Sequence, residues 1–117
     1  ASTTWNTAPT NTSHAVNAMQ DNAWNAVNER LTAIRGLADN WDGQGAVALT
    51  AALVDAAEQA AISCRSLGDR PPDRVLAGVN GTVFFEWDSP DEYTEMEFVS
   101  LGRTEVRRTK VAPEGAV

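Results

Sequence analysis

Carboxylates are concentrated in one short stretch of this sequence. Between Glu86 and Glu97 there are six acidic residues and no basic one: Glu86, Asp88, Asp91, Glu92, Glu95 and Glu97. Carboxylates at alternate positions of a strand share one face, where they can act as a general acid and base or attract a basic ligand. Phe84 and Tyr93 lie beside them in the sequence. Aromatic side chains ringed by charge are typical of protein-binding surfaces.

Two functions from different classes fit this acidic stretch. The first is a non-enzymatic interaction module, such as an inhibitor, an antitoxin-like factor or an assembly subunit, that presents an acidic, aromatic-flanked hairpin to a basic protein partner. Its predicted partner-binding residues are Phe84, Glu86, Asp91, Glu92, Tyr93, Glu95 and Glu97. The second is a small hydrolase that uses the carboxylates of Glu86, Glu95 and Glu97. We favour the first, because so short a chain has little room for both a core and a deep substrate cleft.

Two plainer alternatives stay open beside these. An acidic hairpin can serve only to keep a small protein soluble. The chain can also be a structural protein that self-associates, so a homo-oligomer is among the expected states.

Other catalytic and metal-binding chemistry fits the sequence poorly. The single cysteine, Cys64, falls on the apolar stripe of a predicted helix, where burial would leave the thiol unreactive. The single histidine, His14, adjoins a segment that we expect to be flexible. The loop Asp39–Gly43 can be aligned with a calcium-binding loop. That alignment puts Ala38 and Leu49 at the two most demanding ligand positions, where neither side chain has an oxygen to bind calcium. We therefore predict no catalytic residue, no metal site and no cofactor.

The chain as a whole is acidic. It has 117 residues, with 9 Lys and Arg against 16 Asp and Glu, and a formal net charge of −7. A protein that neutralises phosphates needs the opposite balance, so we expect no direct nucleic-acid binding. No apolar run reaches the roughly 18–20 residues that cross a bilayer, so we expect no membrane span. The unpaired cysteine favours a reducing, cytoplasmic location.

Hydrophobic periodicity predicts two helices before the acidic stretch. From about Ala15 to Asn40, apolar residues recur every three or four positions, and this stripe contains Trp24, Val27, Leu31, Ile34, Ala38 and Trp41. The second helix begins after Thr50, a favourable N-cap residue. Gly68 suits the position after its last turn, and Pro71-Pro72 prevents it from continuing.

After Pro72 the hydrophobic period changes to two, which predicts strands over 74–79, 82–87, 92–101 and 104–111. Asn80-Gly81 is a strong signal for a tight hairpin turn. If Gly102-Arg103 is also a two-residue turn, two charge pairs follow, which are Glu97–Arg108 and Glu95–Lys110. The predicted fold is α+β, with a two-helix hairpin packed on one face of a four-stranded antiparallel β-meander.

The expected organisation is a flexible leader over 1–13, a single α+β domain over 14–111 and a flexible tail over 112–117. The core of that domain should join the helices to the sheet. Its predicted residues are Trp24, Leu31, Ile34, Trp41, Leu53, Phe85, Trp87, Met96 and Phe98.

One loop adds a resemblance to known proteins. The segment Asn40-Trp41-Asp42-Gly43-Gln44-Gly45-Ala46 precedes an alanine-rich helix, a Pro-Pro pair, a hairpin and Phe85-Glu86-Trp87. This combination resembles a group of small prokaryotic and phage proteins that share an N-W-D-G-x-G-A loop and an E-W strand. The resemblance covers roughly Leu31 to Phe98 and carries no assigned activity. It implies an accessory protein of mobile or defence-related gene clusters, in which Trp41 and Trp87 anchor the helix pair to the sheet.

Overall fold

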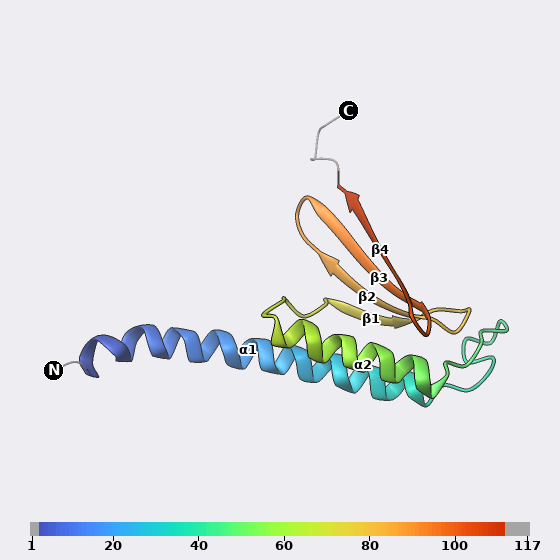
Figure 1. The fold of residues 1–117 in the computed structure, drawn as a ribbon, viewed down its shortest axis with the longest axis horizontal. Coiled ribbons are helices and arrows are strands. Elements are labelled where there is room, and N and C mark those ends of the chain that lie inside the picture. The colour runs from blue at the N-terminus through green and yellow to red at the C-terminus, as the bar shows by residue number, and fades with distance from the viewer. Residues whose placement is uncertain (1–2, 112–117) are drawn as a thin grey trace.

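Two helices and four strands form two layers (Figure 1). The computed structural model describes residues 3–111, so the expected tail over 112–117 lies outside the described residues. The elements are α1 (Thr3–Arg35), α2 (Ala51–Ser66), β1 (Arg74–Ala77), β2 (Val83–Asp88), β3 (Glu92–Ser100) and β4 (Arg103–Lys110). The strands form one antiparallel meander in the order β1-β2-β3-β4, with the helices against it. The predicted α+β fold is confirmed.

The first helix has bounds that differ from the prediction. α1 begins at Thr3, inside the segment expected to be a flexible leader, and it ends at Arg35 rather than near Asn40. At that end the N–H of Gly36 donates to the carbonyl of Ala33 at 3.2 Å, three residues back rather than four. Such a bond tightens the last turn of a helix and closes it. No helix in the described part of the chain combines the length and the apolar character needed to cross a membrane.

The second helix is capped at both ends as predicted. The hydroxyl of Thr50 accepts a hydrogen bond of 3.2 Å from the N–H of Leu53 in the first turn. At the other end Gly68 has a φ of 81°, and its N–H donates to the carbonyl of Arg65. A glycine in this left-handed conformation is a common helix terminator. The two caps set the bounds of α2, which packs against β2 and β3.

The core lies between the helices and the inner face of the sheet. The buried cluster consists of Trp24, Val27, Leu31, Ile34, Leu49, Leu53, Val54, Ala57, Ala61, Val75, Val83, Phe85 and Phe98. The rings of Phe85 and Phe98 pack edge to face with centroids 4.9 Å apart, a favourable aromatic geometry. Trp87 and Met96 are partly buried against this cluster. Trp41 is half-buried outside it, because the chain leaves α1 before reaching this residue.

Both predicted charge pairs between the last two strands are wrong. The structure replaces Glu97–Arg108 and Glu95–Lys110 by Glu97–Glu105 and Glu95–Arg107. The connecting turn comes earlier than expected, because Ser100 already pairs with Arg103 and Gly102 takes a φ of 78°. A register shift between Phe98 and Ser100 moves the observed pairing of β3 and β4 further from the predicted one. Such an irregularity moves every later pair and leaves little trace in the alternation of residue types.

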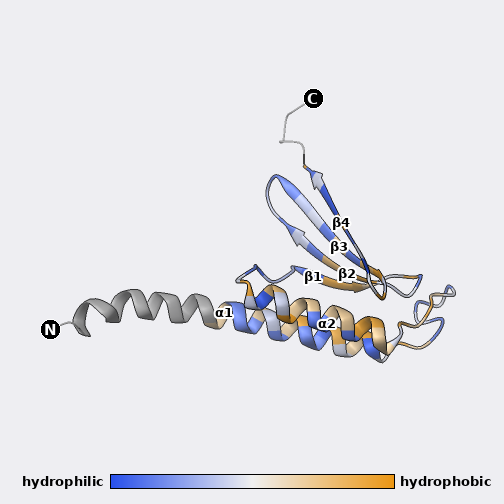
Figure 2. Cartoon of the chain, in the orientation of Figure 1, coloured by the Kyte–Doolittle hydropathy of each residue, from blue (hydrophilic) through white to orange (hydrophobic). Residues whose placement is uncertain are grey.

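The helices cover only part of the sheet. Within residues 3–111, α1 contacts β1, α2 contacts β2 and β3, and neither helix contacts β4. Figure 1 shows β3 and β4 rising away from the helices. Figure 2 shows hydrophobic residues where the helices meet the sheet and mostly hydrophilic residues along β4. The sheet therefore has a face without any helix, which we call the outer face.

Candidate protein interface on the outer face of the sheet

The outer face carries five of the seven predicted partner-binding residues. Side chains alternate between the two sides of a strand, so the neighbours of buried Val83, Phe85 and Phe98 point outward. The side chains on this face include Arg74, Leu76, Phe84, Glu86, Asp88, Tyr93, Glu95, Glu97, Arg103, Glu105 and Arg107. They come from all four strands, which lie in the hydrogen-bonded order given above.

Four charged residues form a straight row across this face. Arg74, Glu86, Glu95 and Arg107 are successive partners in the register of the sheet. Nε of Arg74 donates to Glu86 Oε1 at 2.7 Å, and Nε of Arg107 donates to Glu95 Oε2 at 2.6 Å. The two carboxylates in the middle of the row would repel each other if they were alone. The arginine at each end of the row compensates for that repulsion.

The hydroxyl of Tyr93 lies between the two central carboxylates. It donates to Glu86 Oε2 at 2.7 Å, and its oxygen lies 3.2 Å from Glu95 Oε1. Burial raises the pKa of Tyr93 above its ordinary range, and the bond to Glu86 raises it further. The phenol therefore keeps its proton, and this proton stabilises the pair of facing carboxylates.

The neighbouring row is apolar at one end and acidic at the other. Its successive residues are Leu76, Phe84, Glu97 and Glu105. Arg107 also forms ion pairs with the two acids of this row. Its Nη2 lies 2.6 Å from Glu97 Oε1, and its Nη1 lies 2.9 Å from Glu105 Oε1. Phe84 is half-buried, and its ring lies so close to Gly78 that a Cβ on the glycine would be 2.8 Å from Phe84 Cε2. The glycine thus makes room for the ring on the outer face.

Charge on the outer face is unevenly balanced. Five carboxylates share three guanidinium groups there, which leaves two negative charges in excess. Hydrogen bonds from Arg74 hold the pKa of Asp88 below its ordinary value, and those from Arg103 do the same for Glu105. These acids stay ionised, so the excess charge persists in neutral solution.

The remaining two predicted residues lie away from the outer face. Asp91 is in the turn between β2 and β3, where its carboxylate accepts a hydrogen bond of 3.1 Å from Ser89. Glu92 points to the inner side of the sheet, with Oε1 3.9 Å from Nε of Arg108, and it lines a groove of about 440 Å³ beside Trp87. The acidic stretch is continuous in sequence, but the structure divides it between two surfaces.

Two arginines that were not predicted as site residues hold the carboxylates of the outer face. Arg74 contacts two of its five carboxylates, Glu86 and Asp88, and Arg107 contacts the other three. Both arginines lie at outward-facing positions of predicted strands, and this alternation marks them as surface residues. Most of the carboxylates that they contact lie on other strands, so these ion pairs follow only from the strand register.

The geometry gives no support to the hydrolase alternative. Glu86, Glu95 and Glu97 are spread over an open face, and none of them lines the groove of about 440 Å³ beside Trp87. Carboxylate catalysis needs groups that converge on an enclosed substrate. Burial also raises the pKa of the Cys64 thiol, which disfavours the reactive thiolate. Among the described residues, no group of three or more His, Cys, Asp and Glu side chains is placed to hold a metal ion.

In the Asn40–Ala46 loop, the polar side chains accept hydrogen bonds from backbone N–H groups of the loop itself. Oδ1 of Asp42 accepts hydrogen bonds from the N–H groups of Gln44 at 2.8 Å and Ala46 at 3.0 Å. Oδ1 of Asn40 accepts one from Gly45 at 2.7 Å, and Asn40 itself has a φ of 63°. These bonds explain the spacing of Asn, Asp and Gly in the motif as a requirement of the loop conformation.

Comparison of the chain with protein-family models, curated proteins and solved structures finds no match.

Proposed function

We propose that this chain is a non-enzymatic protein-interaction module that binds a basic protein partner through its outer face, as an inhibitor, an antitoxin-like factor or an assembly subunit. The observation that carries the proposal is the charge balance of that face, where five carboxylates share three guanidinium groups. An excess of negative charge on one face attracts basic partners and repels acidic ones. The unpaired Cys64 supports a cytoplasmic setting for this partnership.

The ion pairs prepare the face for binding. Arg107 holds both Glu95 and Glu97, whose side chains are only 20% and 18% exposed. Because these carboxylates are already ordered, an arriving cation does not have to immobilise them, and less conformational entropy is lost on binding. Charges of this kind mainly raise the association rate, so salt should slow the encounter.

Apolar contact is available beside the charges. Leu76 is 36% exposed and Phe84 is half-buried, and the two are neighbours in the same row. An aromatic ring next to carboxylates can support the aliphatic stem and the charged head of a lysine or arginine. The face therefore offers both components that recur at protein–protein hot spots, an apolar anchor and a charged surround.

A charge-reversal experiment tests the proposal. The wild-type chain, immobilised and exposed to an extract of its native host, should retain a basic protein. Glu95→Lys with Glu97→Lys should abolish this recovery, because the variant carries an excess of positive charge on the outer face. The matched control is Asp91→Lys with Glu92→Lys, which makes the same change in net charge away from that face and should keep the partner.

Folding of both double variants is checked first by circular dichroism and thermal unfolding. If the lysine variant at Glu95 and Glu97 does not fold, the corresponding double Gln variant removes the charge with little change of shape. Partner recovery that is equal for wild type and the folded outer-face variant would contradict the proposal.

A further inference from the structure

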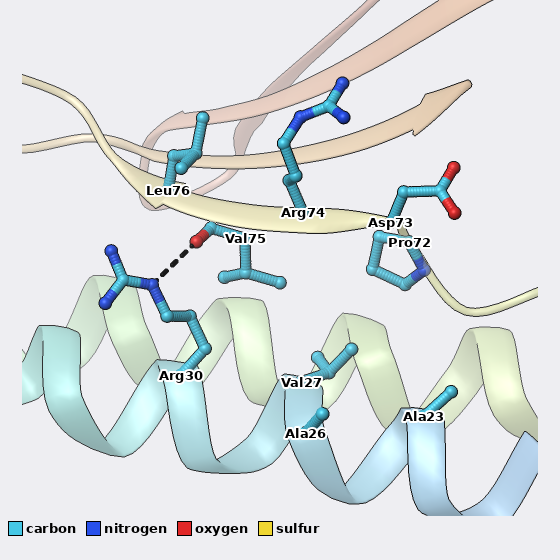
Figure 3. Close-up of a pocket in the computed structure, with 9 residues that line it drawn as sticks. All are labelled: Ala23, Ala26, Val27, Arg30, Pro72, Asp73, Arg74, Val75 and Leu76. Atoms are coloured by element: carbon cyan, nitrogen blue, oxygen red, sulfur yellow. Dashed lines mark hydrogen bonds between the residues drawn. The ribbon is translucent and has the colours of Figure 1, made fainter.

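A groove runs between α1 and β1, at the edge of the sheet opposite β4 (Figure 3). Two adjoining cavities of about 310 and 540 Å³ form it, and they share Ala23, Ala26, Pro72 and Asp73 as lining residues. Figure 3 shows the small side chains of Ala23 and Ala26 below the strand, whereas Arg74 and Leu76 point away from the helix. The floor is therefore shallow and largely apolar, so another backbone can come close to the strand.

The edge of β1 has backbone groups that no other strand uses. The N–H of Gly78 bonds to the carbonyl of Thr82 at 2.7 Å across the hairpin. Because pairing alternates along an antiparallel strand, Ala77 and Val75 turn their N–H and carbonyl groups outward. In the described part of the chain, no hydrogen bond reaches the outward groups of Ala77 or the N–H of Val75.

Two short contacts limit the open part of this edge. Nε of Arg30 donates to the carbonyl of Val75 at 3.0 Å, as the dashed line in Figure 3 marks. Beyond the end of β1, the N–H of Val47 donates to the carbonyl of Val79 at 2.9 Å. The free stretch between them matches a short extended segment rather than a long strand.

Of the arginines that line the groove, Arg30 is the one that has no carboxylate partner among the described residues. It belongs to none of the ion pairs among the described residues, and its side chain is exposed. Asp73, at the other end, is neutralised by Arg70, with Nη1 and Oδ2 3.0 Å apart. Among the described residues, the groove thus has one cation that no carboxylate neutralises and one anion that is already paired, which favours an acidic ligand.

We propose that this groove binds an extended, acidic peptide segment of a partner protein, which adds a short strand to β1 and places a carboxylate on Arg30. Its backbone pairs with the N–H of Val75 and with the N–H and carbonyl of Ala77, and side chains on one side of it rest on Ala23 and Ala26. The Nη groups of Arg30 bind the carboxylate through charge-assisted hydrogen bonds. The groove adjoins the outer face at Arg74 and Leu76 but selects the opposite charge.

A library of random heptapeptides displayed on phage tests this inference. Selection on the immobilised wild-type chain should enrich peptides that carry Asp or Glu and alternate apolar residues. The most enriched sequence, synthesised with a fluorescent label, should bind Arg30→Gln about tenfold more weakly in fluorescence anisotropy. Arg108→Gln loses the same charge on the far edge strand and should bind as wild type does.

An NMR titration and a second variant test whether the peptide binds in this groove. Titration followed by ¹⁵N-resolved NMR should shift the amide signals of Val75 and Ala77 before those of β4. Ala26→Trp, which fills the groove from an exposed helix position, should abolish binding without unfolding the chain. The inference is overturned if no peptide is enriched, if the enriched peptides lack a carboxylate, or if Arg30→Gln and Arg108→Gln bind equally well.

Discussion

Glu86 and Glu95 lie directly opposite each other on β2 and β3, and the hydroxyl oxygen of Tyr93 is 2.7 Å from one carboxylate and 3.2 Å from the other. Facing carboxylates destabilise an antiparallel pair unless something compensates. Here two arginines flank the pair and one phenol proton lies within it. The centre of the outer face therefore depends on the protonation of Tyr93.

Tyr93 should ionise at unusually high pH. Burial and then the bond to Glu86 raise its pKa. Since it is the chain's single tyrosine, the ultraviolet absorbance of tyrosinate reports this residue alone. In the urea-unfolded chain the absorbance should rise near pH 10, whereas in the native protein it should rise only at higher pH. Coincident titrations of the two states would contradict this assignment.

The same shift makes stability depend on alkaline pH. Above about pH 10 the unfolded chain loses the tyrosine proton while the native protein keeps it, so the free energy of unfolding falls as the pH rises. Tyr93→Phe should reduce this decline, because the variant has no phenol to ionise. At neutral pH it should lose about 1 kcal/mol through the missing hydrogen bond, measured by urea unfolding.

Gly78→Ala should destabilise the protein and disturb the outer face. The added Cβ would overlap Thr82 Oγ1 and lie 2.8 Å from Phe84 Cε2, so the ring must move. Overpacking of this kind costs about 1–3 kcal/mol, which urea unfolding can measure. Gly36→Ala is the control, because its nearest neighbour would be 3.6 Å away, and it should change stability by less than about 0.5 kcal/mol. Equal effects of the two substitutions would contradict the close packing at Gly78.

Local signals in the sequence predicted the fold class and the faces of the strands. The alternation around Val83 and Phe85 identified the buried side of β2, and it placed Phe84 on the opposite side. Thr50 and Gly68 predicted the ends of α2, because a cap depends on residues within one turn. These features require no knowledge of distant parts of the chain.

Features that depend on distant pairs could not be predicted in the same way. The register shift between Phe98 and Ser100 changes which base meets Glu95, although the alternation of residue types hardly changes. For the same reason, the stretch from Glu86 to Glu97 lacks bases in sequence but not in space, since Arg107 comes from β4. The end of α1 was also missed, because a glycine near a helix end can either continue the helix or close it.

Arg107→Gln should destabilise the protein more than Arg108→Gln. Arg107 contacts three carboxylates at 2.6 to 2.9 Å, whereas Arg108 is 66% exposed and only approaches Glu92, at 3.9 Å. Thermal unfolding followed by circular dichroism compares the two variants, which lose the same charge on the same strand. A double-mutant cycle should also give a larger coupling for Glu97 with Arg107 than for Glu97 with Arg108. The reverse order would restore the register expected from a two-residue turn.

Asp42 should contribute to stability in acid through the Asn40–Ala46 loop. Backbone hydrogen bonds, first from Gln44 and then from Ala46, lower the pKa of its carboxyl group. As the pH falls below about 4, the unfolded chain therefore binds the proton before the native protein does, and the free energy of unfolding decreases. Asp42→Asn keeps an acceptor oxygen but cannot ionise, so its urea midpoint should fall less steeply with acid than that of wild type. Asp42→Ala loses the acceptor and should be weaker at neutral pH as well, whereas acid slopes that are identical in wild type and Asp42→Asn would show that this carboxylate does not link folding to pH.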